Sequence, residues 1–123
     1  MLPLNVKQVR MYSLTIKYEG RWPSTNDLRN KHWRSNQGLK QKWRKELGSL
    51  ITEKRVKKLK KFRIKVLYNS RLDPDNVTLK FFCDSLKDKG VIIDDNKKYF
   101  RGFSIDPDET LSHNTYILTV TEV

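Results

Sequence analysis

The chain has 123 residues, 26 of them Lys or Arg and 14 Asp or Glu, so its formal net charge at pH 7 is +12. This length fits one domain, residues 1–123, and excludes two cores of ordinary size. The lone Cys83 excludes an intramolecular disulfide, and no apolar run is long enough to predict a membrane span.

The charge is divided unevenly along the chain. Residues 1–65 carry 19 Lys or Arg against 4 Asp or Glu, whereas residues 66–123 carry 7 against 10. A basic half beside a mildly acidic half indicates a protein that binds a polyanion and also holds a separate carboxylate cluster. The sequence shows no secretion signal, and a single thiol fits a reducing cytoplasm.

The first half of the chain predicts two strands and a helix. Residues 12–18 alternate apolar and polar side chains, as a half-buried strand does, and a polar loop with several aromatic residues follows over 20–33. Residues 37–53 place apolar side chains at helical spacing, and residues 62–68 alternate again as a second strand.

The second half predicts a helix and two more strands. Asp75 or Asn76 is a suitable N-cap for a helix reaching about Lys87, with Cys83 in its buried stripe. Residues 99–105 and 115–120 read as strands joined by a hairpin turn over 106–109. The order β-α-β-α-β-β predicts a small α+β domain with a mixed sheet of about four strands and two main helices.

Asp73 and Asp75 are the first candidate site residues. They lie two positions apart at a strand end, so in an extended chain both carboxylates leave the same face, and Pro74 favours that shape. Two adjacent carboxylates repel each other unless a cation lies between them, and Mg²⁺ prefers oxygen ligands. The pair Asp94-Asp95, after a short apolar segment, is a candidate source of a further ligand. The alternative is a Pro-Asp turn with solvated acids, which is how we interpret the second Asp-Pro-Asp, at 106–108.

Lys80 and Asp84 lie four residues apart on the predicted helix. By itself this spacing predicts an exposed ion pair, worth a few tenths of a kcal/mol. The position of Lys80, one turn after the paired aspartates, also allows a second role. An ammonium group there can neutralise a phosphate or the charge that develops during its hydrolysis.

These residues together resemble the RusA family of Holliday-junction resolvases. The resemblance rests on an ordered series: Arg71-x-Asp73-x-Asp75-Asn76, Lys80, Asp84-x-Leu86, Gly90 and Asp94-Asp95, with Pro23-Ser24-x-Asn26 upstream. One departure concerns Lys80, which lies five residues after Asp75 where the family's lysine lies four after the matching acid. Either the helix starts later than Asn76, or Lys80 is not equivalent to that lysine.

The resemblance implies a RusA-like fold and a Mg²⁺-dependent endonuclease, with Mn²⁺ as a substitute, that resolves four-way DNA junctions. Asp73, Asp75 and Asp95 would be the catalytic, metal-binding acids, with Asp94 beside them, and Lys80 the catalytic lysine. It further implies a homodimer in the cytoplasm of a bacterium or a phage-infected cell, with no membrane association and no small-molecule cofactor.

A further set of residues is predicted to contact DNA. Six Lys or Arg fall within residues 54–61, and more basic residues lie on the polar face of the first helix. Such contacts to phosphate position DNA without reading its sequence. The predicted DNA-binding residues are Arg71, Asn76, Lys40, Arg44, Lys54, Arg55, Lys57, Lys58, Lys60 and Lys61.

The aromatic residues of the early loop and the two histidines have simpler interpretations. Tyr18, Trp22 and Trp33 can stack on unpaired bases, but we expect at least two of them to pack in the core. His32 and His113 lie outside the acidic series and are expected to be structural or surface residues.

Two competing functions remain beside junction resolution. One is a metal-dependent nuclease with the same acids that acts on flaps or single-stranded DNA. The other is a basic nucleic-acid-binding protein without catalytic activity. Clustered carboxylates disfavour the second, because without a metal they repel the phosphate backbone.

Overall fold

The computed structural model describes residues 12–24, 37–54 and 58–123. In these ranges the chain is a small α+β domain with a four-stranded mixed sheet and two helices, in the predicted order. The elements, with a short 3₁₀ turn η1, are β1 (Ser13–Glu19), α4 (Gln37–Lys54), β2 (Phe62–Asn69), η1 (Pro74–Asn76), α5 (Lys80–Asp88), β3 (Phe100–Pro107) and β4 (Thr115–Glu122).

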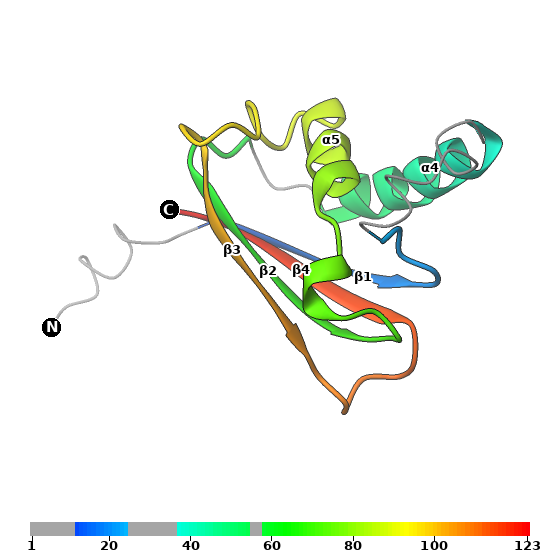
Figure 1. Cartoon of the computed structure of the whole chain (residues 1–123). Helices are drawn as coiled ribbons and strands as arrows, with labels where there is room; N and C mark the ends of the chain where they lie inside the picture. Colours follow the sequence, from blue (N-terminus) through cyan, green and yellow to red (C-terminus); the bar gives the residue numbers. More distant parts are fainter. Residues whose placement is uncertain (1–11, 25–36, 55–57) are drawn as a thin grey trace, which may run out of the picture.

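The strands lie in the order β1-β4-β2-β3 (Figure 1). Strand β4 runs antiparallel to both of its neighbours, and β3 runs parallel to β2 at the sheet edge. The hairpin predicted over 106–109 is therefore wrong, because β2 separates β3 from β4. Parallel pairing makes β2 and β3 end at the same side of the sheet, so the chain must pass the end of β2 before β4 starts.

The loop that makes this passage is tied to the end of β2. The Asp108 N–H donates to the Tyr68 carbonyl at 2.7 Å, and the Asn114 N–H donates to the Asn69 carbonyl at 2.6 Å. The Asn69 side-chain amide donates to the Leu111 carbonyl at 2.7 Å. These bonds fix the start of β4 beside the segment that follows β2, where the candidate acids begin.

Both helices cover one face of the sheet (Figure 1). The alternating side chains of β1 and β2 turn one set of residues toward the helices and leave the other set exposed. Tyr18 and Trp22 are buried in this core, which confirms the expectation that at least two of the three aromatic residues pack there. Trp33 lies outside the described residues. Cys83 is also buried, as predicted.

Helix α5 begins later than predicted. Neither Asp75 nor Asn76 caps it, since Pro74–Asn76 form a 3₁₀ turn and the helix starts at Lys80 with Leu79 as its N-cap residue. A contact distant in sequence explains the delay. Val77 pairs with Ser24 in an isolated β-bridge, which requires an extended backbone just where the helix would have started.

Candidate functional site

Asp73 and Asp75 follow β2 and are both exposed. Asp73 is extended, with φ −78° and ψ 155°, but Asp75 lies inside the 3₁₀ turn. The alternation of an extended chain therefore does not apply to this pair, because the extended backbone ends at Asp73 and the turn begins at Pro74. The prediction that both carboxylates leave one face through an extended backbone is wrong in that respect.

Both carboxylates affect the Tyr68 hydroxyl electrostatically. The pKa of Tyr68 is raised first by burial, then by the neighbouring Tyr116 and by the negative charges of Asp73 and Asp75. The Tyr68 hydroxyl donates a hydrogen bond of 2.7 Å to the Leu72 carbonyl, which holds the segment just before Asp73 against the sheet. The turn therefore leaves both acids exposed just after this anchored segment.

Lys80 occupies the first turn of α5 and contacts Asp84. Its ammonium nitrogen lies 3.7 Å from Asp84 Oδ1, with the lysine side chain 60% exposed. Of the two explanations for its unusual spacing from Asp75, the structure shows the later helix start. The pair is a loose surface contact, and such pairs contribute about 0–1 kcal/mol.

Asp94 and Asp95 lie beyond the other end of α5 and share one lysine. Lys87 Nζ lies 3.4 Å from Asp94 Oδ1 and 3.7 Å from Asp95 Oδ1. Asp94 Oδ1 also accepts the Asp95 N–H at 2.8 Å, and this bond is the main reason that the pKa of Asp94 is lowered. The pKa of Lys87 is raised, chiefly by its hydrogen bond to Asp94.

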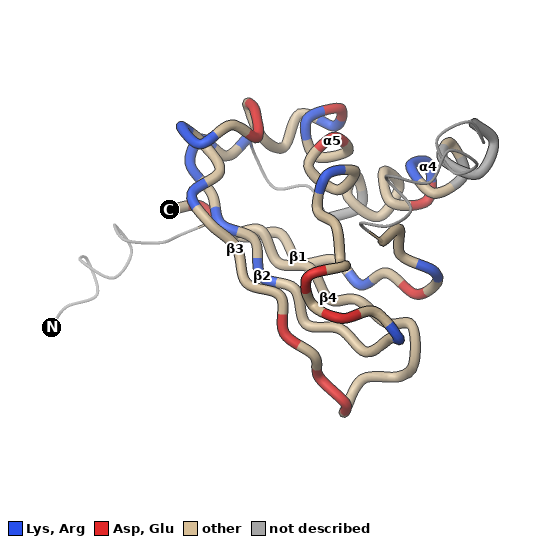
Figure 2. The backbone as a smooth tube through the Cα atoms, in the orientation of Figure 1, with Lys and Arg blue, Asp and Glu red and all other residues tan. Residues whose placement is uncertain are grey.

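The two acidic pairs are therefore separated along α5. Lys80 and Lys87 are seven positions apart, which is about 10 Å along a helix axis. Figure 2 shows the acidic residues of η1 near the start of α5 and those of the loop before β3 beyond its far end. In the part of the chain that the structure describes, no three His, Cys, Asp or Glu side chains gather closely enough to hold a metal ion.

The chemistry of Asp73 and Asp75 still fits a divalent cation. They offer hard carboxylate oxygens at an exposed position, and Mg²⁺ is commonly held by one or two carboxylates together with water and substrate phosphate. Asp94 and Asp95 offer the same oxygens, but here Lys87 neutralises them. The assignment of Asp73, Asp75, Asp94 and Asp95 as metal ligands stays a prediction.

The predicted DNA-binding residues lie in several places. Lys58, Lys60 and Lys61 are exposed just before β2, and Arg44 Nη2 forms a 3.0 Å ion pair with Asp88 Oδ2. Asn76 is half-buried in η1. Arg55 and Lys57 lie outside the described residues, and of Lys40 and Lys54 only the backbone is described, as part of α4.

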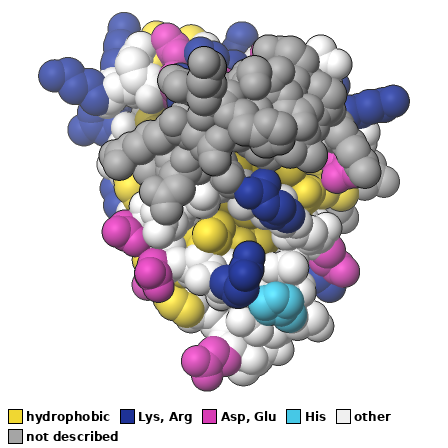
Figure 3. Space-filling model, turned by 45° about the vertical axis from the view of Figure 1, so that its right-hand side comes forward, with side chains coloured by type: hydrophobic (Ala, Val, Ile, Leu, Met, Phe, Trp, Pro, Cys, Tyr) yellow, Lys and Arg dark blue, Asp and Glu magenta, His cyan; other side chains and the backbone are white. Residues whose placement is uncertain are grey.

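A pocket of about 290 Å³ adjoins the candidate acids and was not foreseen from the sequence. Arg71 and Leu72, immediately before Asp73, form part of its wall. The other residues come from the segment after β1 and from the start of β4. The complete lining is Arg21, Trp22, Ser24, Ser70, Arg71, Leu72, Asn114 and Tyr116. On the face seen in Figure 3, basic side chains stand on two sides of a hollow with hydrophobic atoms at its base.

Sequence spacing gives no sign that Arg21 and Arg71 share this pocket. The only local signals are the Pro23-Ser24 motif beside Arg21 and the acidic motif beside Arg71. The Ser24–Val77 bridge joins these two motifs in space. His113 lies on the exposed surface, as expected, and His32 falls outside the described residues.

No protein-family model matches the chain, and a search of curated proteins finds no match to it. Among the described residues, no helix is both long enough and apolar enough to cross a membrane.

Proposed function

We propose that this protein is a Mg²⁺-dependent, structure-selective endonuclease that resolves four-way DNA junctions by paired phosphodiester hydrolysis. The observation that carries the proposal is the position of Asp73 and Asp75. The two exposed carboxylates lie two residues apart in the segment that directly follows Arg71 and Leu72 at the wall of a pocket. A carboxylate pair beside a guanidinium suits a cation and a phosphate bound next to each other.

In this proposal Asp73 and Asp75 are the primary ligands of the metal. Bound Mg²⁺, with Mn²⁺ as a substitute, supplies Lewis-acid stabilisation of the charge on the phosphate oxygens. Asp95, with Asp94 beside it, is the proposed further carboxylate, and to reach this metal it must leave Lys87 and the loop that carries it must move toward the start of α5. The ion pairs that hold these two acids are 3.4 and 3.7 Å long, with the Lys87 side chain 37% exposed, so water screens them.

Lys80 is the proposed catalytic lysine. Its ammonium group is held only by the exposed contact with Asp84 at 3.7 Å, and exchanging that partner for a phosphate costs little. A phosphodiester carries one negative charge, as a carboxylate does, but further negative charge develops on its oxygens during hydrolysis, so the charge-assisted hydrogen bond from Lys80 strengthens in the transition state.

The proposed substrate is branched DNA, and the proposed assembly is a homodimer that places one active site on each of two arms. We place the protein in the cytoplasm of a bacterium or a phage-infected cell. The net charge of +12 supports binding to DNA through phosphates. A preference for branch shape requires no contacts to base edges.

One observation favours a second candidate, a nucleic-acid-binding protein without catalysis. Lysines pair with Asp84, Asp94 and Asp95, so these acids have partners without a metal. The third candidate, a nuclease for flaps or single strands, uses the same residues as the leading one.

One experiment separates the three. The purified protein is incubated with end-labelled four-way junction, flap, single strand and duplex, with and without Mg²⁺. Paired nicks in the junction alone, dependent on Mg²⁺, are the expected result. Preferential cutting of flap or single strand supports the third candidate, and binding without any cutting supports the second.

A further inference from the structure

The pocket beside the candidate acids has a rigid wall. Trp22 and Tyr116 stack with ring centroids 5.1 Å apart, and the Trp22 indole N–H donates to the Thr78 carbonyl at 2.8 Å. Tyr116 and Ser70 hydroxyls lie 2.6 Å apart, and Ser70 Oγ also accepts the Leu72 N–H at 3.2 Å. These contacts join residues of the wall to one another and to the segment before Asp73, and a wall held by such contacts favours affinity because little of it has to be ordered on binding.

Asn114 is fixed at the pocket by its backbone. It has a φ of 60°, the left-handed conformation that asparagine tolerates better than most residues. Its N–H donates to the Asn69 carbonyl, and its own carbonyl accepts the Gly20 N–H at 2.9 Å. The strand ends that contribute Arg21, Ser70 and Asn114 are therefore tied to one another around the opening.

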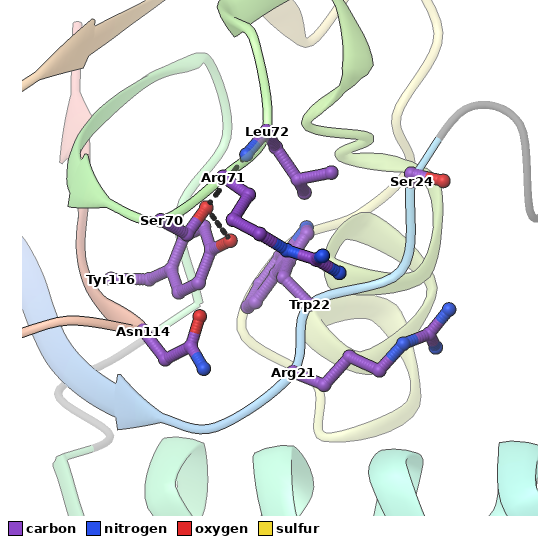
Figure 4. Close-up of a pocket in the computed structure, with 8 residues that line it drawn as sticks. All are labelled: Arg21, Trp22, Ser24, Ser70, Arg71, Leu72, Asn114 and Tyr116. Carbon is purple, nitrogen blue, oxygen red and sulfur yellow. Dashed lines mark hydrogen bonds between the residues drawn. The ribbon is translucent and has the colours of Figure 1, made fainter.

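The charge of the pocket is positive. Its lining contains two arginines and no acidic residue. The Arg71 side chain extends across the cavity beside Trp22, and the Arg21 guanidinium lies farther from Ser70 and Tyr116 (Figure 4). Within the described residues, the Arg71 guanidinium has no hydrogen-bond or ion-pair partner. Ser24 and Asn114 place a hydroxyl and an amide on the same lining, and both groups can donate hydrogen bonds to an anion.

We propose that this pocket binds one phosphate group of a DNA strand, a phosphodiester, with Arg71 as its principal ligand and Arg21, Ser24 and Asn114 around it. The planar guanidinium matches the oxygens of a phosphate in a bidentate manner. The volume of about 290 Å³ suits a single nucleotide unit rather than a larger ligand.

The role of this phosphate rests on the proposed nuclease function. Arg71 and Asp73 are two residues apart, so their Cα atoms are separated by at most about 7 Å. Along one strand of duplex DNA this corresponds to roughly two nucleotide steps of about 3.4 Å. A phosphate held by Arg71 would therefore fix the strand close to the phosphate that Asp73 and Asp75 face.

Binding can be measured without catalysis, by NMR titration of the protein with inorganic phosphate and with the dinucleotide d(TpT) in Mg²⁺-free buffer. We expect saturable shifts of the Trp22 indole N–H and the Asn114 side-chain amide. Because hydrogen bonds to charged groups are among the stronger ones, Arg71→Ala should bind d(TpT) at least about tenfold more weakly. Arg71→Lys keeps the charge but loses the bidentate geometry of the guanidinium, so its affinity for d(TpT) should lie between those of the wild type and of Arg71→Ala.

The matched control is Arg101→Ala, which removes an exposed arginine from β3, away from the pocket lining. This variant should bind d(TpT) as the wild type does. Equal affinity of Arg71→Ala and the wild type, or shifts confined to residues outside the pocket, would overturn the inference. Near-UV circular dichroism of each variant checks that it is folded.

Junction nicking distinguishes the failure of this inference from the failure of the proposed function. If the wild type binds d(TpT) at the pocket but cuts no DNA, the phosphate site stands and the nuclease proposal fails. If the wild type nicks junctions and Arg71→Ala retains both wild-type KM and wild-type d(TpT) affinity, the nuclease proposal stands and the phosphate site is wrong.

Discussion

Asp73 and Asp75 have different local backbones, yet their charges act together. Asp75→Asn removes one negative oxygen from the proposed metal site while keeping the shape of the side chain. Metal ions contribute several kcal/mol to transition-state stabilisation, so junction nicking should fall at least about 100-fold. Junction affinity should stay equal or increase, because a charge that repels DNA is removed. Gel-based nicking and binding assays measure the two effects separately.

The second Asp-Pro-Asp supplies a control from the same chain. Asp108 Oδ1 accepts hydrogen bonds from the Thr110 N–H and hydroxyl, as in a local turn, and these bonds lower its pKa. Asp108→Asn should therefore nick junctions at about the wild-type rate. If Asp75→Asn cut DNA as fast as Asp108→Asn in Mg²⁺, the metal assignment of Asp75 would be wrong.

Cys83 is a buried thiol and not a nucleophile. Burial, reinforced by the charges of Asp95 and Asp84, raises its pKa from 9.0 to about 12. The raised pKa means that the protonated thiol favours the folded state below pH 9.0, and that this contribution is lost as the pH rises toward 12. At pH 8 we expect the native protein to react with a thiol-specific disulfide reagent far more slowly than the urea-unfolded chain. Equal rates would show that Cys83 is accessible in the native state.

At the scale of elements, the first turn of α5 carries the proposed catalytic lysine. Lys80→Ala should lower kcat for junction nicking about 100-fold, in the range seen when one donor that stabilises transition-state charge is removed. Thermal stability should change little, because the Lys80–Asp84 pair is exposed. Steady-state kinetics and a melting curve measure both quantities.

Lys89→Ala is the control for that change. Lys89 is exposed immediately after α5, at the end opposite Lys80. The Lys89→Ala variant should retain the wild-type kcat for junction nicking. A loss of activity equal to that of Lys80→Ala would indicate a general effect of charge, and Lys80 would lose its catalytic assignment.

The element order and the helix α4 could be predicted from the sequence because their signals are local. Alternating side chains in β1 and β2 and helical spacing between them depend only on near neighbours. The start of α5 could not, because the Val77–Ser24 bridge joins residues far apart in the chain. The parallel pairing of β3 with β2 could not be predicted either, because no turn motif in the sequence indicates it.

For the site, the sequence singled out the acids but not their spatial grouping. A 3₁₀ turn sets the backbone between Asp73 and Asp75, and Asp94-Asp95 are held by Lys87 at a distance set by the length of α5. The pocket depended on three segments meeting at one end of the sheet. Which segments lie together is determined by the topology of the sheet, and local sequence patterns do not predict that topology.

At the scale of the whole molecule, the basic residues before β2 and the acids Asp73 and Asp75 lie at opposite ends of β2. Lys and Arg gather where β2 starts, whereas Arg71 and Asp73 follow its end (Figure 2). The eight residues of β2 span about 26 Å at roughly 3.3 Å per residue. DNA that contacts both ends must extend over about eight base pairs at roughly 3.4 Å each. An arm of a junction meets this requirement, and a nucleotide or short flap does not.

The last prediction concerns the lysines just before the start of β2. Leu59 is buried and pairs with Ile92, and its neighbours Lys58 and Lys60 are both exposed. Residues on either side of an extended position share a direction, so both ammonium groups can face one DNA strand. Lys58→Gln with Lys60→Gln should lower the slope of log affinity against log salt by about 0.9 for each phosphate that the two lysines neutralise.

The double variant Lys17→Gln with Lys65→Gln is the control, because it removes equal charge from the sheet face opposite the helices, and it should keep the wild-type slope. Equal slopes for the two double variants would mean that overall charge, and not this end of β2, determines DNA binding.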